Sequence, residues 1–153
     1  MIKYFLFIIT IITGSDTLRD QYKNVSDKAI KEILGAGDLE KIEIEPAREY
    51  YRFVSENEKN GSVVVYSSAK GRYENFDFMV ILNNKAEILN IRILKYRSEY
   101  GYEISNKGLL KQFYNKPVQN FGYGKDIDVI SGASFSARAL VDDVNHILGF
   151  LQK

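Results

Sequence analysis

The sequence contains no cysteine and no tryptophan, and only one histidine, two prolines and two methionines in 153 residues. Without cysteine the chain cannot form disulfides, ligate iron–sulfur clusters, perform thiol redox chemistry or be acylated at an N-terminal cysteine. A single histidine without cysteine also excludes the usual ligand sets of zinc and haem. We therefore expect no metal site.

The sequence also lacks an excess of either charge, because 21 basic and 20 acidic residues leave a formal net charge of +1. This balance gives no indication of nucleic-acid binding, so no nucleic-acid partner is expected. A content of 45% hydrophobic and 27% charged residues is ordinary for a globular protein. With no internal repeat or linker, the length predicts a single domain with a real core.

The first 15 residues follow the plan of a secretory signal peptide. Residues 1–3 give a short positive start, residues 4–12 are almost wholly apolar, and residues 13–15 are small or polar. The apolar run is too short for a membrane span. We predict a signal peptide or short N-terminal anchor over residues 1–15, and an exported, extracytoplasmic domain over residues 16–153, in the periplasm or associated with a membrane. A buried first strand is the alternative.

Apolar periodicity predicts an α+β fold, in which helices pack on an antiparallel sheet. Residues 26–34 predict a helix with Ser26 as its N-cap, ended by the glycines of residues 35–37. Residues 42–44 and 63–66 predict short strands.

A β-hairpin is predicted next in the chain. Alternating apolar residues over 76–82 lead into Asn83-Asn84, a pair typical of a type I′ turn, and the chain returns as a second strand over residues 86–94. Leu109, Leu110 and Phe113 then predict a short helix.

Small polar residues gather at residues 128–136, at the start of a predicted C-terminal amphipathic helix. One continuous apolar stripe on this helix contains Ala137, Leu140, Val141, Val144, Ile147, Leu148 and Leu151. The first amides of a helix lack intrahelical partners, and the macrodipole favours an anion there, so a phosphate would bind well at this point.

Gly132 and Ala133 have almost no side chain, so a ligand phosphate can come close to the backbone at this helix start. The hydroxyls of Ser131, Ser134 and Ser136 lie within one turn. The alternative is that Ser131 is simply an N-cap, the position that serine favours.

The pattern Asp-x-x-Ser-Gly-Ala-Ser-x-Ser at residues 128–136 resembles the flavinylation motif of the FMN-binding domain family. That family includes the C subunit of the sodium-translocating NADH:quinone reductase and the G subunit of the Rnf complex. Its motif usually reads Asp-x-x-(Ser/Thr)-Gly-Ala-Thr, and a separate FAD:protein FMN transferase esterifies the last hydroxyl with the phosphate of FMN. The matching residue here is Ser134, a serine in place of threonine that keeps the Oγ nucleophile. The resemblance implies that Asp128 helps the transferase to engage the segment, with an ordinary turn acid as the alternative.

A second segment resembles the same family in the same order along the chain. The family loop often reads Glu-Thr-x-Gly, and Ser98-Glu99-Tyr100-Gly101 matches it with the acid displaced by one position. Gly101 permits close approach of the backbone to a flat ligand, and Tyr100 and Tyr102 can stack on an isoalloxazine ring. The alternative is a tyrosine-rich surface turn. The family helix ends near Gln-Phe, here Gln112-Phe113, and the resemblance spans roughly residues 66–151.

Arg138 lies one helical turn after Ser134, so its guanidinium can reach back to a phosphate attached there. The alternative is a solvent-exposed arginine that pairs with Asp142. The Asp142-Asp143 pair is interpreted as a solvated helix face. A serine hydrolase is excluded, because His146 lies roughly 18 Å from Ser134 along the same helix, at about 1.5 Å of rise per residue.

The resemblance implies an exported electron-transfer protein that carries FMN as a phosphoester on Ser134, an electron carrier rather than a stand-alone enzyme. Its partners would be the FMN transferase and redox proteins, soluble or membrane-bound. The predicted cofactor-binding residues are Glu99, Tyr100, Gly101, Asp128, Ser131, Gly132, Ala133, Ser134, Ser136 and Arg138; no catalytic residue is assigned. The alternatives are an exported interaction domain without flavin and an FMN-dependent reductase.

Overall fold

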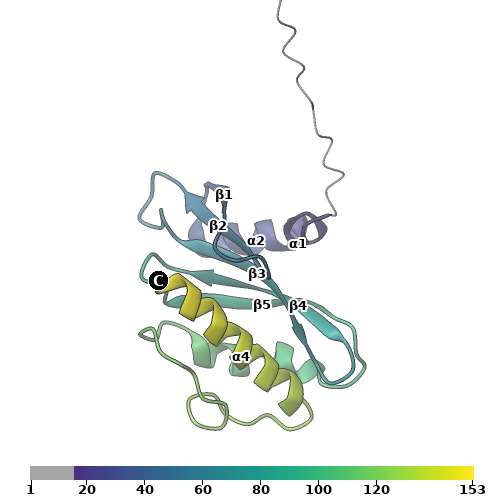
Figure 1. The fold of residues 1–153 in the computed structure, drawn as a ribbon. Helices are drawn as coiled ribbons and strands as arrows, with labels where there is room; N and C mark the ends of the chain where they lie inside the picture. Colours follow the sequence, from purple (N-terminus) through teal and green to yellow (C-terminus); the bar gives the residue numbers. More distant parts are fainter. Residues whose placement is uncertain (1–15) are drawn as a thin grey trace, which may run out of the picture.

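The computed structural model describes residues 16–153, so the predicted signal peptide or anchor at residues 1–15 lies outside the described residues. The described chain forms one antiparallel sheet in which the strand order follows the sequence (Figure 1). Its strands are β1 (Asp38–Ile42), β2 (Glu49–Val54), β3 (Val63–Lys70), β4 (Asn75–Leu82) and β5 (Ile88–Tyr96). The predicted α+β fold is confirmed.

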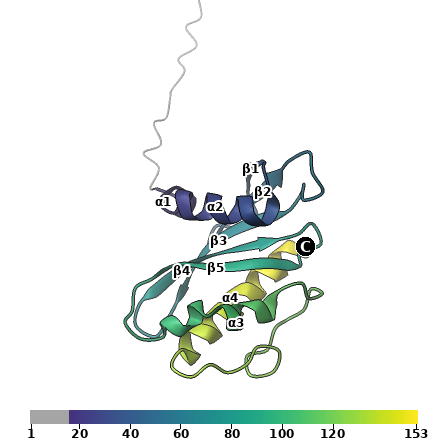
Figure 2. The same ribbon diagram turned by 180° about the vertical axis from the view of Figure 1, so that it is seen from behind.

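Two sets of helices flank the sheet. The first set is α1 (Leu18–Gln21) and α2 (Lys23–Leu34) at the N-terminal end of the described chain. The second set follows the last strand and comprises η1 (Tyr102–Ser105), α3 (Lys107–Leu110), η2 (Lys111–Phe113) and α4 (Ser134–Leu151). Figures 1 and 2, seen from opposite sides, show α2 on one face of the sheet and α4 with α3 on the other. In residues 16–153 no helix is long and apolar enough to cross a membrane.

Each face of the sheet has its own core, because neighbouring strand residues point to opposite faces. Val65 of β3 and its partner Val80 of β4 belong to the cluster that includes the α4 residues Leu140 and Val144. The next paired residues belong to the α2 cluster, which contains Ala29, Ile30, Leu34, Val64, Tyr66, Met79 and Ile81. The sheet therefore separates α2 from α4.

The predicted stripe on α4 is confirmed, since its residues from Ala137 to Leu148 are buried and Leu151 packs partly buried against the same cluster. The interpretation of Asp143 as solvated was wrong. Its carboxylate accepts two hydrogen bonds from Arg48, with Arg48 Nη2 2.6 Å from Oδ1, and another from the hydroxyl of Ser67 in β3. Arg48 also binds Glu45, so this polar network joins the middle of α4 to the β1–β2 loop.

Three local predictions were wrong in detail. The strand predicted at residues 42–44 lies earlier, since β1 spans Asp38–Ile42. Ser26 is not an N-cap, because α2 begins at Lys23 and the buried Ser26 hydroxyl donates to the carbonyl of Tyr22. Serine inside a helix can bond back to the preceding turn in this way, so the residue type alone did not locate the helix start.

The predicted hairpin is confirmed, but its turn is longer than two residues. Strand β5 begins only at Ile88, and Ala86 has φ 61°. The side chain of Asn83 accepts hydrogen bonds from the amides of Lys85 and Glu87, and this organises the longer loop.

Candidate functional site

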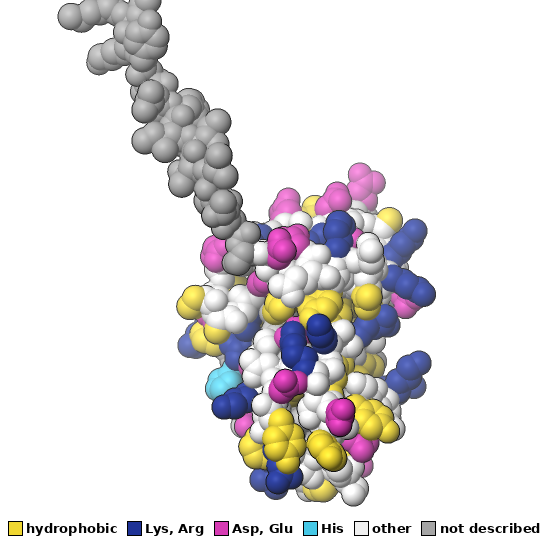
Figure 3. Space-filling model, turned by 90° about the vertical axis from the view of Figure 1, so that its right-hand side faces the viewer, with side chains coloured by type: hydrophobic (Ala, Val, Ile, Leu, Met, Phe, Trp, Pro, Cys, Tyr) yellow, Lys and Arg dark blue, Asp and Glu magenta, His cyan; other side chains and the backbone are white. Residues whose placement is uncertain are grey.

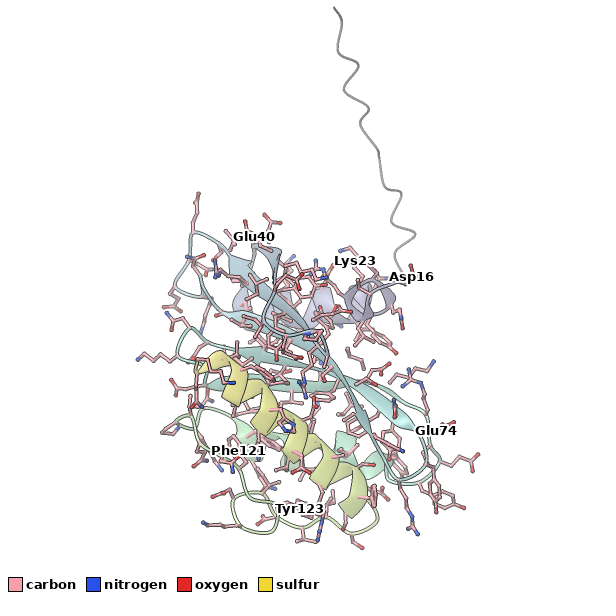
Figure 4. The ribbon with its side chains drawn as sticks, viewed as in Figure 1. Asp16, Lys23, Glu40, Glu74, Phe121 and Tyr123 are labelled. Atoms are coloured by element: carbon pink, nitrogen blue, oxygen red, sulfur yellow. The ribbon has the colours of Figure 1, made fainter. Side chains whose placement is uncertain are left out.

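A pocket of about 520 Å³ lies where three segments meet at one end of the sheet. The β3–β4 turn supplies Arg72 and Tyr73, and the loop after β5 supplies Tyr100 and Gly101. The start of α4 supplies Gly132, Ala133, Ser134, Phe135 and Ser136. Figure 4 marks this end by Glu74, at the tip of the β3–β4 turn. The volume falls in the range of roughly 300–1,000 Å³ typical of small-molecule sites.

The floor of the pocket is the N-terminus of α4. The helix begins at Ser134 with Ala133 as its N-cap, so the alternative that Ser131 is the N-cap was wrong. Alanine has no side-chain acceptor, and the first turn contains no acidic residue. The amides of residues 134–136 and the positive end of the helix dipole are therefore left for solvent or an anion.

The two pocket serines have different environments. Ser134 is exposed, and its hydroxyl donates to the carbonyl of Ile130 at 3.1 Å. Ser136 is 2% exposed and lies 2.8 Å from the hydroxyl of Tyr96. Because Tyr96 has one hydroxyl proton and donates it to the carbonyl of Tyr100, Ser136 must be the donor to Tyr96. Ser134 is thus accessible for chemistry, whereas Ser136 ties α4 to the end of β5.

Two glycines are required where the pocket segments approach each other. Gly101 has φ 91°, and a Cβ there would lie 2.5 Å from the hydroxyl of Tyr96. Gly132 has φ 85°, and a Cβ there would lie 2.9 Å from Oε1 of Glu103, a side chain whose Oε2 is buried without a hydrogen-bond partner in the described structure. Any larger residue would push the motif loop away from its neighbours.

The rim of the pocket is aromatic and carries one positive charge. Three aromatic side chains at the rim are mostly exposed, namely Tyr73 (60%), Tyr100 (71%) and Phe135 (60%). Aromatic side chains of this size are usually mostly buried in a folded protein. The rings of Tyr73 and Tyr100 lie 6.1 Å apart, and the guanidinium of Arg72 lies 5.3 Å from the centre of the Tyr73 ring. Figure 3 faces the right-hand side of Figure 1 and shows hydrophobic side chains gathered at the lower end of the molecule, next to basic ones. Such a rim suits a flat ring system with an anionic tail.

The structure brings six of the ten predicted cofactor residues into the pocket, namely Tyr100, Gly101, Gly132, Ala133, Ser134 and Ser136. Ser131 and Asp128 are exposed and are not among the residues that line it. Asp128 is fixed through its amide, which donates to the side chain of Gln112 at 2.7 Å. Glu99 lines a neighbouring hollow of about 340 Å³ on the other side of Tyr73 and Tyr100.

Arg138 is exposed and lies outside the residues that line the pocket. Its guanidinium is 5.4 Å from the centre of the Tyr123 ring. The expected pairing with Asp142 is not among the salt bridges of residues 16–153. The role of Arg138 in phosphate binding stays a prediction, and Arg72 is the cation that lines the pocket.

Sequence reasoning missed Arg72, Tyr73, Phe135 and Tyr96. Phe135 occupies a position of the motif where any residue is allowed. Only its location between Ser134 and Ser136 could have indicated that it lines the pocket. Arg72 and Tyr73 lie in a hairpin turn about 60 residues before the motif, and no local pattern tells which turn will meet a helix start.

A buried acid holds the loop that contains Tyr100 and Gly101. Asp77 of β4 is 2% exposed, and Arg97 Nη2 and the Tyr22 hydroxyl each lie 2.6 Å from its Oδ2. Burial alone would raise the pKa of Asp77, but the hydrogen bonds from Arg97 and Tyr22 outweigh it and lower the pKa. Arg97 is the first residue after β5, so this ion pair fixes the start of the loop.

These features fit FMN. The free amides and Arg72 suit its phosphate, the aromatic rim suits its ring, and glycines at 101 and 132 leave room beside the backbone. A comparison with curated proteins finds no match. The family model described as the FMN-binding domain matches residues 71–149, more than half of the chain and a range that contains every residue lining the pocket. This chain therefore belongs to the FMN-binding domain family, and its cofactor is FMN.

Proposed function

We propose that this protein is an exported electron carrier that holds FMN covalently, through a phosphoester on Ser134. The proposal rests on the different exposure of the three motif serines and on their positions relative to the pocket. Ser134 is exposed and lines the pocket, Ser136 is buried and donates to Tyr96, and Ser131 lies outside the pocket lining. Ser134 also begins α4, where a helix N-terminus stabilises the phosphate that would be attached.

The attachment would be a phosphoryl-group transfer with FAD as the co-substrate, supplied by a separate FAD:protein FMN transferase. Ser134 Oγ would form a bond to the FMN phosphorus of FAD while the pyrophosphate bond to AMP breaks. AMP leaves, and the serine proton passes to a base of the transferase or to water. Arg72 and the amides of residues 134–136 would then face the negative phosphoester.

FMN supplies the redox chemistry when it is bound, and the protein's own residues bind and orient it. The nine residues that line the pocket include no histidine, aspartate or glutamate that would exchange protons with a substrate. The exposed rings of Tyr73 and Tyr100 lie at the rim, where a partner protein can approach. Both observations favour an electron carrier with redox partner proteins over a stand-alone reductase. The sequence pattern of residues 1–15 supports work outside the cytosol.

The proposal is tested by co-expressing the protein with an FMN transferase and recording flavin fluorescence in a denaturing gel. The wild type should fluoresce, and Ser134→Ala should be dark while remaining folded, because alanine is well tolerated in the first turn of a helix. Ser105→Ala, at an exposed serine outside both the motif and the pocket lining, is the control and should fluoresce like the wild type. Fluorescence that survives Ser134→Ala would reject Ser134 as the acceptor.

A further inference from the structure

Tyr123 is linked to Ser134 through a single residue. The amide of Ile130 donates to the hydroxyl of Tyr123 at 3.1 Å, and the carbonyl of Ile130 accepts the Ser134 hydroxyl, also at 3.1 Å. Both hydrogen bonds are made by the same short segment of backbone. The position of Ile130 therefore decides where the acceptor of the Ser134 hydroxyl lies.

The loop that carries Tyr123 is closed by its own hydrogen bonds. Gly122 accepts from the amides of Lys125, Asp126 and Ile127 at 2.8–3.1 Å, and the amide of Gly124 donates to the carbonyl of Ile127 at 2.6 Å. The carboxylate of Asp126 accepts from the Gly122 amide at 2.8 Å. These internal hydrogen bonds restrict the conformation of the loop and therefore the position of the Tyr123 ring.

The same loop is attached to the helix that begins at Ser134. The side chain of Asn145 exchanges two hydrogen bonds with the backbone of Phe121, at 2.8 and 2.9 Å. Arg138 stacks over the ring of Tyr123 at 5.4 Å. Arg138 and Asn145 are seven residues apart and so share one face of α4. Figure 4 shows Phe121 and Tyr123 beside the ribbon of α4.

We propose that Tyr123 is a positioning residue for the modification of Ser134, an inference that rests on the function proposed above. By holding Ile130, Tyr123 fixes the carbonyl to which the Ser134 hydroxyl donates, and this fixes the rotamer and the lone pairs of Oγ. A nucleophile held in one orientation reacts faster than one that samples several. Arg138 supports Tyr123 by its contact with the face of the ring, 5.4 Å from the ring centre.

The test is the variant Tyr123→Phe, which removes the hydroxyl and keeps the ring under Arg138. Labelling by purified transferase with FAD is followed over a range of protein concentrations. The kcat should fall roughly 3- to 10-fold, the size expected for one lost neutral hydrogen bond, while KM stays nearly constant. A merely structural loss would instead lower the melting temperature and leave the kcat of the folded fraction unchanged.

Two further variants make the test specific. Tyr114→Phe removes a tyrosine hydroxyl that also bonds one residue's backbone, the N–H and C=O of Ile91 at 3.1 Å, away from the pocket. It should lower stability without lowering kcat. The loss of kcat caused by Tyr123→Phe should be smaller in a Ser134→Thr background than in the wild type, because the β-branched side chain restricts its own rotamers.

Equal kcat values for the wild type and Tyr123→Phe would overturn the inference, and so would an equal loss in Tyr114→Phe. Neither result would argue against the modification of Ser134 itself. If a transferase that labels another substrate leaves the wild type unlabelled, the proposed function fails, and the inference falls with it.

Discussion

At the scale of single residues, Arg72 is the only cation among the residues that line the pocket. In the Ser134→Ala background, where FMN can be held only without the ester, Arg72→Gln should raise the Kd for FMN roughly tenfold, because a charge-assisted hydrogen bond to the phosphate is lost. Fluorescence titration measures this Kd. High salt should reduce the difference, since it screens the guanidinium.

The same titration with Arg138→Gln tests the sequence-based prediction for that residue and serves as the comparison. From its place over Tyr123 we expect a smaller effect than for Arg72→Gln. A larger effect for Arg138→Gln would assign the phosphate to Arg138 and contradict the role of Arg72.

The residues of the motif were predictable because their function depends on local spacing. Gly132, Ala133, Ser134 and Ser136 lie within one stretch, and the structure brings them into the pocket with Gly101. The aromatic rim was only partly predictable. Tyr100 was predicted as a ring-stacking residue because it precedes Gly101 in the sequence. Tyr73 was not predicted, because it reaches the pocket only where the sheet brings the β3–β4 turn to the start of α4.

At the scale of elements, α4 is fixed to the sheet by Asp143 as well as by its apolar stripe. Asp143→Ala should lower the free energy of unfolding by about 2 kcal/mol, because Arg48 loses one of its two carboxylate partners and keeps only Glu45, and the buried hydroxyl of Ser67 loses its acceptor. Asp142→Ala is the matched control on the exposed side of the helix and should change stability by less than about 0.5 kcal/mol. Urea denaturation measures both, and equal values would contradict a structural role for Asp143.

The helices and strands followed from periodicity, since the spacing of apolar residues reports which side is buried. The α4 stripe is the clearest case. The polar residues on the elements were harder to interpret. Arg48, which binds Asp143, is 95 residues away in the sequence. The sequence around Asp143 therefore gave no indication of this ion pair, and the aspartate was predicted to be solvated.

At the scale of the whole molecule, Asp77 links the N-terminal helices, the sheet and the pocket loop through Tyr22 and Arg97. Its pKa is lowered in the folded protein. At acidic pH the folded state therefore binds fewer protons than the unfolded chain, whose aspartates titrate at about pH 3.9. The stabilisation by Asp77 is complete above that pH and is lost as the pH falls through the lower folded-state pKa.

Melting temperatures recorded between neutral pH and about pH 2 should therefore fall steeply in the wild type below about pH 4. Asp77→Asn should melt at a lower temperature at neutral pH and show a flatter decline in acid. Parallel curves for the two proteins would show that Asp77 makes no such contribution.

One pocket, built by three distant segments, is proposed to hold FMN on Ser134. The most direct measurement is peptide-resolved mass spectrometry of the wild-type protein after co-expression with an FMN transferase. We predict one FMN phosphoester, on the peptide that contains the motif, with fragment ions assigning it to Ser134. An adduct on Ser131 or Ser136, or an unmodified motif peptide from a culture in which the transferase is active, would rule out Ser134 as the attachment site.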